Sequence, residues 1–210
     1  MTRVIETAYH LVDANNWTSV QTHGLMSARR LMERCASTED SSAARRHRPA
    51  SWRLPSGVLI RDQSPMPPKI LRRCLRNGLI PEDWFELLNS KVFFWLDPGR
   101  LNRQRLACGE SPQIALIVNA SRLLMKYAAS AAVTPINTGN ALRSAAARNL
   151  STFVPYERWL IDAWAYEDIP GMRPRPKNHR PVELTINEAV PDILDYVTAT
   201  VPLNPGEILK

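Results

Sequence analysis

Apolar and polar residues alternate along several short stretches of the chain, which is the pattern of half-buried strands. In residues 4–12, Tyr9 and Leu11 share one predicted face and His10 lies on the opposite one. The run QIALIV is the most apolar of these stretches and predicts a central strand. Besides residues 4–12, the stretches predicted to be strands are residues 58–60, 91–97, 113–118 and 182–186. The run QIALIV is residues 113–118.

Helix-type spacing and capping residues predict helices between these strands. Asp13 or Asn15 can cap the first helix, which Gly24 is expected to end. Residues 37–56 are polar, small and basic, and residues 170–181 contain four prolines, so both segments are predicted to be irregular. Further helices are expected to begin near Ser27, Pro67 or Pro68, Pro81, Pro98 and Ser121.

Short strands mixed with separate helices are typical of an α+β fold rather than of a doubly wound parallel sheet. The length of 210 residues suits one domain, residues 1–210, with a mobile basic loop at about 37–56. No apolar run reaches the roughly 18 residues of a membrane span. The first residues also lack a signal-peptide pattern. A cytoplasmic location is therefore expected.

The net charge of the chain indicates which class of partner it favours. The formal net charge is +7 and the pI is about 9.7, a balance that favours polyanions such as nucleic acid or nucleotides. Only five of the 27 Lys and Arg residues are lysines. Arginine binds phosphate bidentately, but a codon bias toward arginine gives the same composition. The composition alone leaves both explanations open.

The sequence lacks the motifs of several common metal sites, nucleotide-binding sites and enzymes. Cys35, Cys74 and Cys108 have neither CxxC spacing nor histidines at metal-ligand spacing, so neither a disulfide scaffold nor a zinc site is expected. The sequence also lacks the GxGxxG, P-loop, HExxH and GxSxG motifs. His47 and His179 lie in basic loops, where they can contact phosphate, but nothing else distinguishes them.

The last predicted strand carries a glutamate at an informative position. Val182, Leu184 and Ile186 form one apolar face, so Glu183 and Thr185 point to the other face. Such a glutamate is either solvated or directed into a cleft, and the strand pattern does not decide between the two.

Three other features also have two interpretations each. The amide-rich loop Asn137–Asn140 either binds a ligand or is simply a turn. The aromatic run Phe93–Trp95 is either core or a stacking platform. His10 taken alone is either a hydrogen-bonded structural histidine or a functional one.

The order of three short motifs resembles that of the ADP-ribosyltransferase superfamily. Members often open with a YH strand and a helix that ends in a GL turn, and this chain has Tyr9-His10 and then His23-Gly24-Leu25. The aromatic strand VFFWLD is similar to the second motif of that superfamily, and the glutamate strand in RPVELTINEAVPDIL to the third. The pattern is similar to that of DarT-like DNA ADP-ribosyltransferase toxins and, more remotely, to that of PARPs and RNA 2′-phosphotransferases. The chain also resembles a family of small bacterial proteins in its IRDQ, VFFWL and TPINTGN blocks.

This resemblance implies a split antiparallel sheet with surrounding helices, NAD as substrate and no metal. It implies that His10 hydrogen-bonds a ribose of NAD, that Gly24 shapes the nicotinamide pocket, and that Arg61 binds the pyrophosphate. Glu183 is then the catalytic carboxylate, because cleavage of the nicotinamide–ribose bond develops positive charge on the sugar. His10 and Glu183 are therefore expected to face one cleft. The other expected NAD contacts are Phe94, Trp95 and Asn137.

The sequence departs from the family pattern at two places. Phe93 and Phe94 stand where PARPs have a tyrosine, and the NAD-contacting arginine has no certain counterpart. Arg61 is the best match for that arginine, with Arg29 and Arg30 as rivals.

The resemblance and the charge together predict transfer of ADP-ribose to DNA or RNA, with a neutralising antitoxin as a plausible partner of a toxin. Two alternatives remain: modification of a protein or hydrolysis of NAD, and a binding module without catalysis. Basic loops are expected to flank the cleft and guide nucleic acid by phosphate contacts and stacking. The residues expected to do so are Arg45, Arg46, Arg48, Trp52, Arg53, Arg173 and Arg175.

Overall fold

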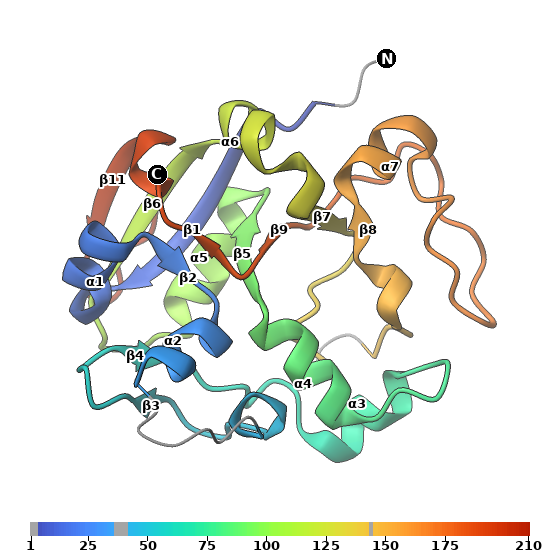
Figure 1. Ribbon diagram of the computed structural model, residues 1–210, viewed down its shortest axis with the longest axis horizontal. Helices are drawn as coiled ribbons and strands as arrows, with labels where there is room; N and C mark the ends of the chain where they lie inside the picture. The colour runs from blue at the N-terminus through green and yellow to red at the C-terminus, as the bar shows by residue number, and fades with distance from the viewer. Residues whose placement is uncertain (1–3, 36–41, 143–144) are drawn as a thin grey trace.

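The computed structural model describes residues 4–35, 42–142 and 145–210 (Figure 1). Its main element is a seven-stranded sheet with the order β11-β6-β1-β5-β9-β7-β8, in which all paired neighbours are antiparallel. The strands of this sheet are β1 (Thr7–Asp13), β5 (Lys91–Trp95), β6 (Gln113–Asn119), β7 (Ala131–Thr134), β8 (Val154–Pro155), β9 (Glu183–Asn187) and β11 (Val197–Leu203).

Helices and two small strand pairs surround the sheet, so the protein is of the α+β class, as the sequence predicts. The two pairs are β2 (Leu25–Met26) with β10 (Ala189–Val190), and β3 (Trp52–Arg53) with β4 (Leu59–Ile60). The α-helices of the described residues are α1 (Trp17–His23), α2 (Ala28–Cys35), α3 (Pro68–Cys74), α4 (Pro81–Asn89), α5 (Pro98–Leu106), α6 (Ala120–Tyr127) and α7 (Tyr156–Asp162). Short 3-10 turns occur at Ala14–Asn16, Ala43–Arg45, Ala128–Ser130, Leu150–Thr152 and Ile193–Asp195.

Local sequence explains where several helices begin. Pro98 opens α5, and the carboxylate of Asp97 accepts a hydrogen bond from the Arg100 backbone N–H at 2.9 Å. In α6 the capping residue is Asn119, whose side chain accepts from the Arg122 N–H. The prediction that Ser121 caps this helix is therefore wrong.

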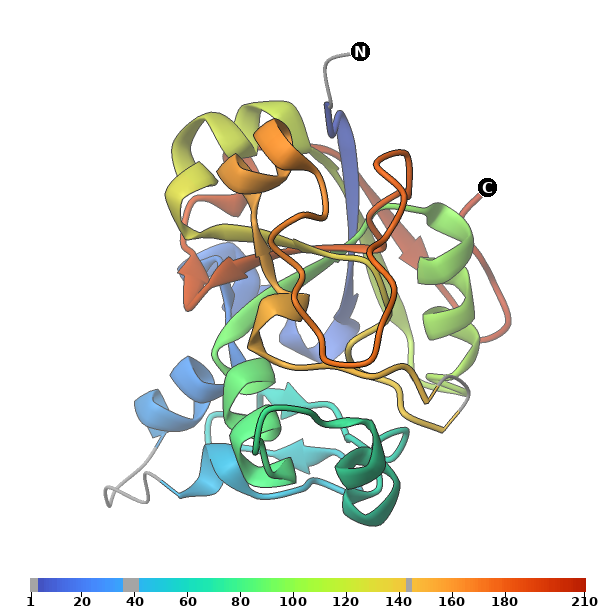
Figure 2. The same cartoon turned by 90° about the vertical axis from the view of Figure 1, so that its right-hand side faces the viewer.

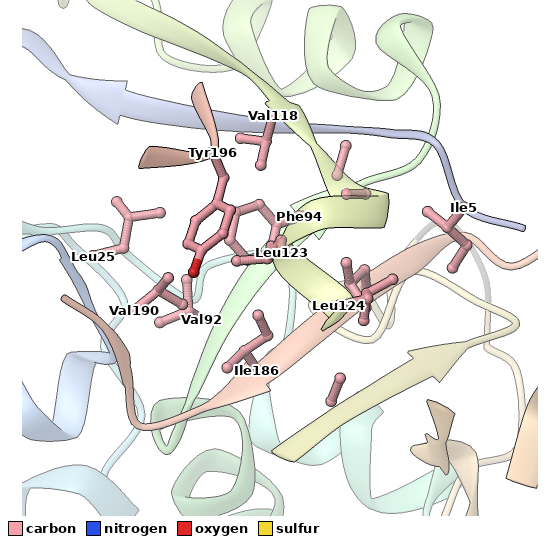
Figure 3. Close-up of a cluster of buried hydrophobic side chains, with 14 of the residues drawn as sticks. Ile5, Leu25, Val92, Phe94, Val118, Leu123, Leu124, Ile186, Val190 and Tyr196 are labelled. Atoms are coloured by element: carbon pink, nitrogen blue, oxygen red, sulfur yellow. The ribbon is translucent and has the colours of Figure 1, made fainter. Parts of the chain in front are cut away.

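Each face of the sheet is covered by its own core, because successive side chains of a strand point to opposite sides. Val92 and Phe94 of β5 belong to the larger core, together with Leu123 of α6 (Figure 3). Leu11 of β1 faces the other side, where Leu101 of α5 is fully buried.

The strands β1 and β5 diverge from each other, so the sheet opens between them. β1 pairs with β6 along its whole length, but it pairs with β5 at one position, Tyr9 opposite Trp95. Beyond that position the end of β1 runs toward α1, whereas β5 starts beside α4 (Figure 1). We call the open region between residues 10–13 of β1 and 91–94 of β5 the fork.

A separate layer lies below the sheet in both views, on the side of β3, β4 and α3 (Figures 1 and 2). Its own small core includes Leu54, Val58 and Ile60. Residues 42–56 contain a 3-10 turn and the strand β3, so the prediction that this segment is wholly irregular is wrong. Residues 37–41 of the predicted loop lie outside the described residues.

The predicted strands near 8–12, 91–96, 113–118 and 182–186 all belong to the one antiparallel sheet, which confirms that expectation. β6 is not central, however, because it lies second from the edge, between β11 and β1. The strands β7 and β11 were not predicted. No helix among the described residues is long and apolar enough to cross a membrane.

Candidate functional site

A cleft of about 1150 Å³ opens at the fork between β1 and β5. Its walls come from both strands of the fork, from the turn between α1 and β2, from β4 and residues 61–66, from α5, and from the loop 137–142. A cleft of this volume is large enough for a dinucleotide-sized ligand. The cleft residues with titratable or amide side chains are His10, Asp13, Asn16, Arg48, Arg61, Asp62, Gln63, Asn89, Lys91, Arg100, Arg103, Gln104, Asn137, Asn140 and Glu183.

His10 bridges the fork. Its Nδ1 lies 2.6 Å from the carbonyl oxygen of Phe93, and its ring centroid lies 5.5 Å from that of Phe94. A carbonyl can only accept, so Nδ1 carries the proton of this hydrogen bond. Burial lowers the pKa of His10 below its usual 6.5, which leaves the ring neutral at neutral pH and Nε2 as an acceptor. The ring therefore accepts from a ligand hydroxyl through Nε2 and does not donate to it.

Glu183 is almost completely buried, with 4% of its surface exposed, and is surrounded by hydrogen-bond donors. Its Oε2 accepts from the hydroxyls of Thr134 and Thr138, both at 2.8 Å, and from the backbone N–H of Thr138 at 3.2 Å. Burial nevertheless raises the pKa of this carboxyl to about 7, against the opposing effect of these bonds. Glu183 is thus neither solvated nor fully open to the cleft.

The hydroxyl of Thr134 explains how this carboxyl can be neutral. Thr134 Oγ1 lies 2.9 Å from the carbonyl of Ile136 and 2.8 Å from Oε2 of Glu183, but it has a single proton. If Thr134 donates to Ile136, its oxygen can accept the proton of a protonated Glu183. This arrangement satisfies all three groups.

A buried arginine holds the same loop from the other side. Arg148 is fully buried and donates to the carbonyls of Thr138 and Asn140, each at 3.0 Å. Glu183 binds the N–H of Thr138 while Arg148 binds its carbonyl. The loop that presents Asn137 and Asn140 to the cleft is therefore fixed by two buried groups of opposite charge.

His10 and Glu183 both border the cleft, but they point to opposite faces of the sheet. Tyr9, Trp95 and Glu183 are direct cross-strand neighbours and share one face, whereas His10 shares the other face with Leu116. Both residues line one cleft, as expected, but they approach it from opposite faces of the sheet, which the strand patterns alone did not predict. Both are within reach of the cleft only because the fork is open.

The aromatic strand is mostly core. Phe94 borders the cleft, but only 1% of its surface is exposed, and its ring packs beside His10. It is therefore not available as a stacking platform, contrary to the expectation for a cofactor contact. Trp95 is half-buried, and its Nε1 donates to Oε1 of Gln104 at 2.6 Å. Of the two rings, Trp95 is the one that can contact a ligand.

Gly24 forms the cleft wall where only glycine fits. Its φ is +72°, and an added Cβ would lie 2.3 Å from the carbonyl oxygen of Val190. The GL turn is thereby packed directly against β10. Arg61 and Asn137, the other predicted NAD contacts, also line the cleft.

The residues predicted to guide nucleic acid are largely engaged elsewhere or lie away from the cleft. Arg45 forms ion pairs with Asp83 and Glu86 of α4, and Arg175 pairs with Glu167. Of the predicted set, Arg48 lines the cleft. The other residues of that set, none of which is among the cleft residues, are Arg45, Arg46, Trp52, Arg53, Arg173 and Arg175.

Sequence reasoning missed several residues of this site. Arg148 has no local signal, because its partners are carbonyls of a loop that the sequence places only as a turn. Arg100 and Arg103 line the cleft from α5 and were assigned no role. A threonine on either side of the Pro135-Ile136-Asn137 tripeptide is the available signal, since Thr134 and Thr138 both reach one carboxylate.

A family of unknown function, DUF7002, has a model that matches residues 6–197. The chain belongs to the DUF7002 family. The DUF7002 match includes β1, the fork, the loop 137–142 and β9, so the whole border of the cleft lies within the family domain. No curated protein matches the sequence. Among the described residues, no group of three or more His, Cys, Asp and Glu side chains could hold a metal ion.

Proposed function

We propose that the cleft binds NAD and that the protein transfers ADP-ribose to DNA or RNA. The observation that carries this proposal is the fork at Tyr9 and Trp95. It brings the YH strand, the aromatic strand and the glutamate strand to one cleft, in the arrangement that the resemblance to ADP-ribosyltransferases implies. The net charge of +7 favours a polyanionic acceptor.

In the proposed reaction the bond between nicotinamide and C1′ of the ribose breaks, and its electron pair leaves with nicotinamide. A new bond then forms between C1′ and a nucleophilic nitrogen or oxygen of the acceptor, which loses a proton. The positive charge that develops on the sugar is stabilised by a nearby carboxylate, as in glycoside hydrolysis. Glu183 is the candidate, and a pKa of about 7 leaves it partly ionised at neutral pH.

The other roles follow from the geometry of the cleft. Nε2 of His10 accepts from a ribose hydroxyl, because its Nδ1 proton is used on Phe93. The guanidinium of Arg61 binds the diphosphate. Trp95 packs against the nicotinamide ring, while Glu183 lies beside it at the apex of the fork. A ribose seated in the fork meets His10 from one face and Glu183 from the other.

A second candidate is a nucleotide-binding protein without transfer activity. The burial of Glu183 favours it, because three donors from Thr134 and Thr138 occupy the carboxylate that the reaction needs. Transfer then requires that Thr138 move away from Glu183.

Incubation with NAD labelled in the adenosine moiety, separately with single-stranded DNA, RNA and cell lysate, tests these alternatives. Label on the oligonucleotide supports the proposal. Label on lysate protein indicates a protein acceptor, and release of nicotinamide without transfer indicates NAD hydrolysis. NAD binding without any turnover supports the second candidate.

A further inference from the structure

Two arginines meet in the cleft wall below the fork. Arg61 follows β4, and its backbone carbonyl accepts a hydrogen bond from Nε of Arg48 at 3.2 Å. Arg48 in turn exchanges backbone and side-chain hydrogen bonds with Gln63 and donates through Nη2 to Asn89 at 2.9 Å. These bonds fix Arg48 in place, so its guanidinium is a permanent part of the cleft.

Neither guanidinium is fully satisfied. Nη1 of Arg48 and Nη1 of Arg61 are both buried without a hydrogen-bond partner in the described part of the chain. Arg61 makes no side-chain hydrogen bond or ion pair within that part either. Asp62 lies nearby, but its carboxylate accepts from the N–H and hydroxyl of Ser64. Asp62 keeps its negative charge and attracts both arginines, so one carboxylate faces two guanidinium groups and the pair retains an excess of positive charge.

A buried N–H group without a hydrogen-bond partner is costly, and a ligand that accepts from both Nη1 atoms would remove that cost. Two neighbouring guanidinium groups offer several donors in fixed planes, which suits the adjacent phosphates of a diphosphate.

We propose that Arg48 and Arg61 together form a seat for a nucleoside diphosphate, and that this anion fastens the layer of residues 42–66 to the cleft. In the proposed function the anion is the diphosphate of NAD, so the identity of the ligand rests on that function. The seat itself does not depend on any catalysis. Arg48, which the sequence assigns to nucleic acid, takes a different role here.

Hydrogen bonds and ion pairs link the layer to α1 and α4 on either side of the cleft. Asn16 pairs through both atoms of its side-chain amide with the backbone of Leu59, each at 2.8 Å. Arg45 pairs with Asp83 and Glu86 of α4. An anion held by Arg48 and Arg61 adds a link at the cleft itself, and the layer then opens less often.

Calorimetric titration of the whole protein with ADP, inorganic pyrophosphate and adenosine tests the seat. We expect ADP and pyrophosphate to bind, and ADP to bind at least about 10-fold more tightly than adenosine. Arg48→Gln and Arg61→Gln should each weaken ADP binding about 10-fold or more, the loss of a charge-assisted hydrogen bond. Arg72→Gln, which removes an exposed arginine of α3 outside the cleft, is the matched control and should bind as the wild type does.

Hydrogen exchange gives a second measurement that does not depend on the variants folding normally. In the wild-type protein, ADP should slow amide exchange in residues 42–66. Arg48→Lys keeps the charge but loses the planar donors, and should show a smaller slowing.

Equal affinity for ADP and adenosine, or equal losses in Arg72→Gln and Arg48→Gln, would overturn the proposal. Displacement of ADP by a single-stranded oligonucleotide with no loss in either cleft variant would overturn it too, because the anion would then belong to nucleic acid. If ADP binds through both arginines and NAD is never consumed, the seat stands and the transferase function fails. If NAD is consumed with equal efficiency by all variants, the seat fails and the transferase function stands.

Discussion

His10 donates from Nδ1 to the carbonyl of Phe93, and this one bond joins the two strands where the sheet parts. It does so in place of the backbone pairing that stops at Tyr9 and Trp95. The bond also selects the tautomer of the ring, because the carbonyl cannot donate. His10 thereby links the two strands through Nδ1 and keeps Nε2 as a hydrogen-bond acceptor at the cleft.

The neutral state of His10 predicts an acid-sensitive fold. Burial lowers its pKa in the folded protein, so protons bind more readily to the unfolded chain. Its contribution to stability is present above the unfolded pKa of about 6.5 and is lost as the pH falls toward the folded pKa. Melting temperatures measured between pH 7.5 and 5 should fall more steeply for the wild type than for His10→Gln. Parallel curves would show that the ring already titrates normally.

Glu183 predicts the opposite pH dependence. Its pKa is raised to about 7, so the folded protein holds its proton more tightly than the unfolded chain. The stability from that proton is present below the unfolded pKa and lost as the pH rises through about 7. Glu183→Gln should therefore stabilise the protein relative to the wild type at pH 8 and change it little at pH 5. Glu110→Gln, an exposed control, should show no such difference.

The same substitution tests the proposed chemistry. If the Glu183 carboxylate opposes the charge on the sugar, Glu183→Gln should lower ADP-ribose transfer about 10²–10³-fold while ADP binding persists. Turnover of labelled NAD by the folded variant is the measurement. Wild-type rates in that variant would assign Glu183 to holding Thr138 and not to catalysis.

Gly24 allows a steric effect to be separated from backbone strain. Gly24→Ala has positive φ and places a Cβ 2.3 Å from the Val190 carbonyl, whereas Gly78→Ala has a similar φ of +74° but open space. Gly78→Ala should cost about 1–2 kcal/mol, the strain of a left-handed residue. Gly24→Ala should cost clearly more, as measured by urea unfolding. Equal costs would mean that β10 moves away freely.

Arg148 should be among the most sensitive positions of the protein. Arg148→Met removes the donors to the carbonyls of Thr138, Asn140 and Ala146, of which that of Thr138 keeps another donor, Nε1 of Trp84 at 3.3 Å. Each unsatisfied buried group costs about 1–3 kcal/mol, so the variant should lose about 3 kcal/mol or more of unfolding free energy. Amide exchange in residues 135–142 should rise before that of β9. A loss below about 1 kcal/mol would indicate that water replaces the guanidinium.

Substitutions in α5, rather than in the basic loops predicted to guide nucleic acid, test which surface binds the acceptor. Charge reversal at Arg45 and Arg48 would break contacts within the protein, so its effect on DNA binding is not diagnostic. Arg100→Glu with Arg103→Glu should weaken binding of single-stranded DNA and lower the salt slope by about 1–2. The paired control, Glu substitutions at the exposed Arg72 and Arg73 of α3, should retain most of the affinity.

Equal losses in the two double variants would show that only net charge matters. No binding by the wild type at low salt would exclude nucleic acid as the acceptor. A protein or small-molecule acceptor would then take its place.

The sequence by itself determined the α+β class, four of the seven strands of the main sheet, and the turn at Gly24. Each depends on local periodicity or on a backbone conformation that one residue type allows. The strand β7 escaped prediction because its four residues, AAVT, are too few to show a period. The strand β11 does alternate, as VTATVPL, but a short alternating segment near the end of the chain does not by itself show which strand it pairs with.

The tertiary structure alone decided the site. Strand alternation was read correctly at His10 and Glu183, but whether their faces coincide depends on the order of strands in the sheet. The surroundings of each arginine also depended on distant carboxylates and carbonyls, which pair Arg45 with α4 and leave Nη1 of Arg61 without a hydrogen-bond partner among the described residues. Charge and hydrogen-bond partners are set by contacts between segments far apart in sequence, and a linear pattern does not contain them.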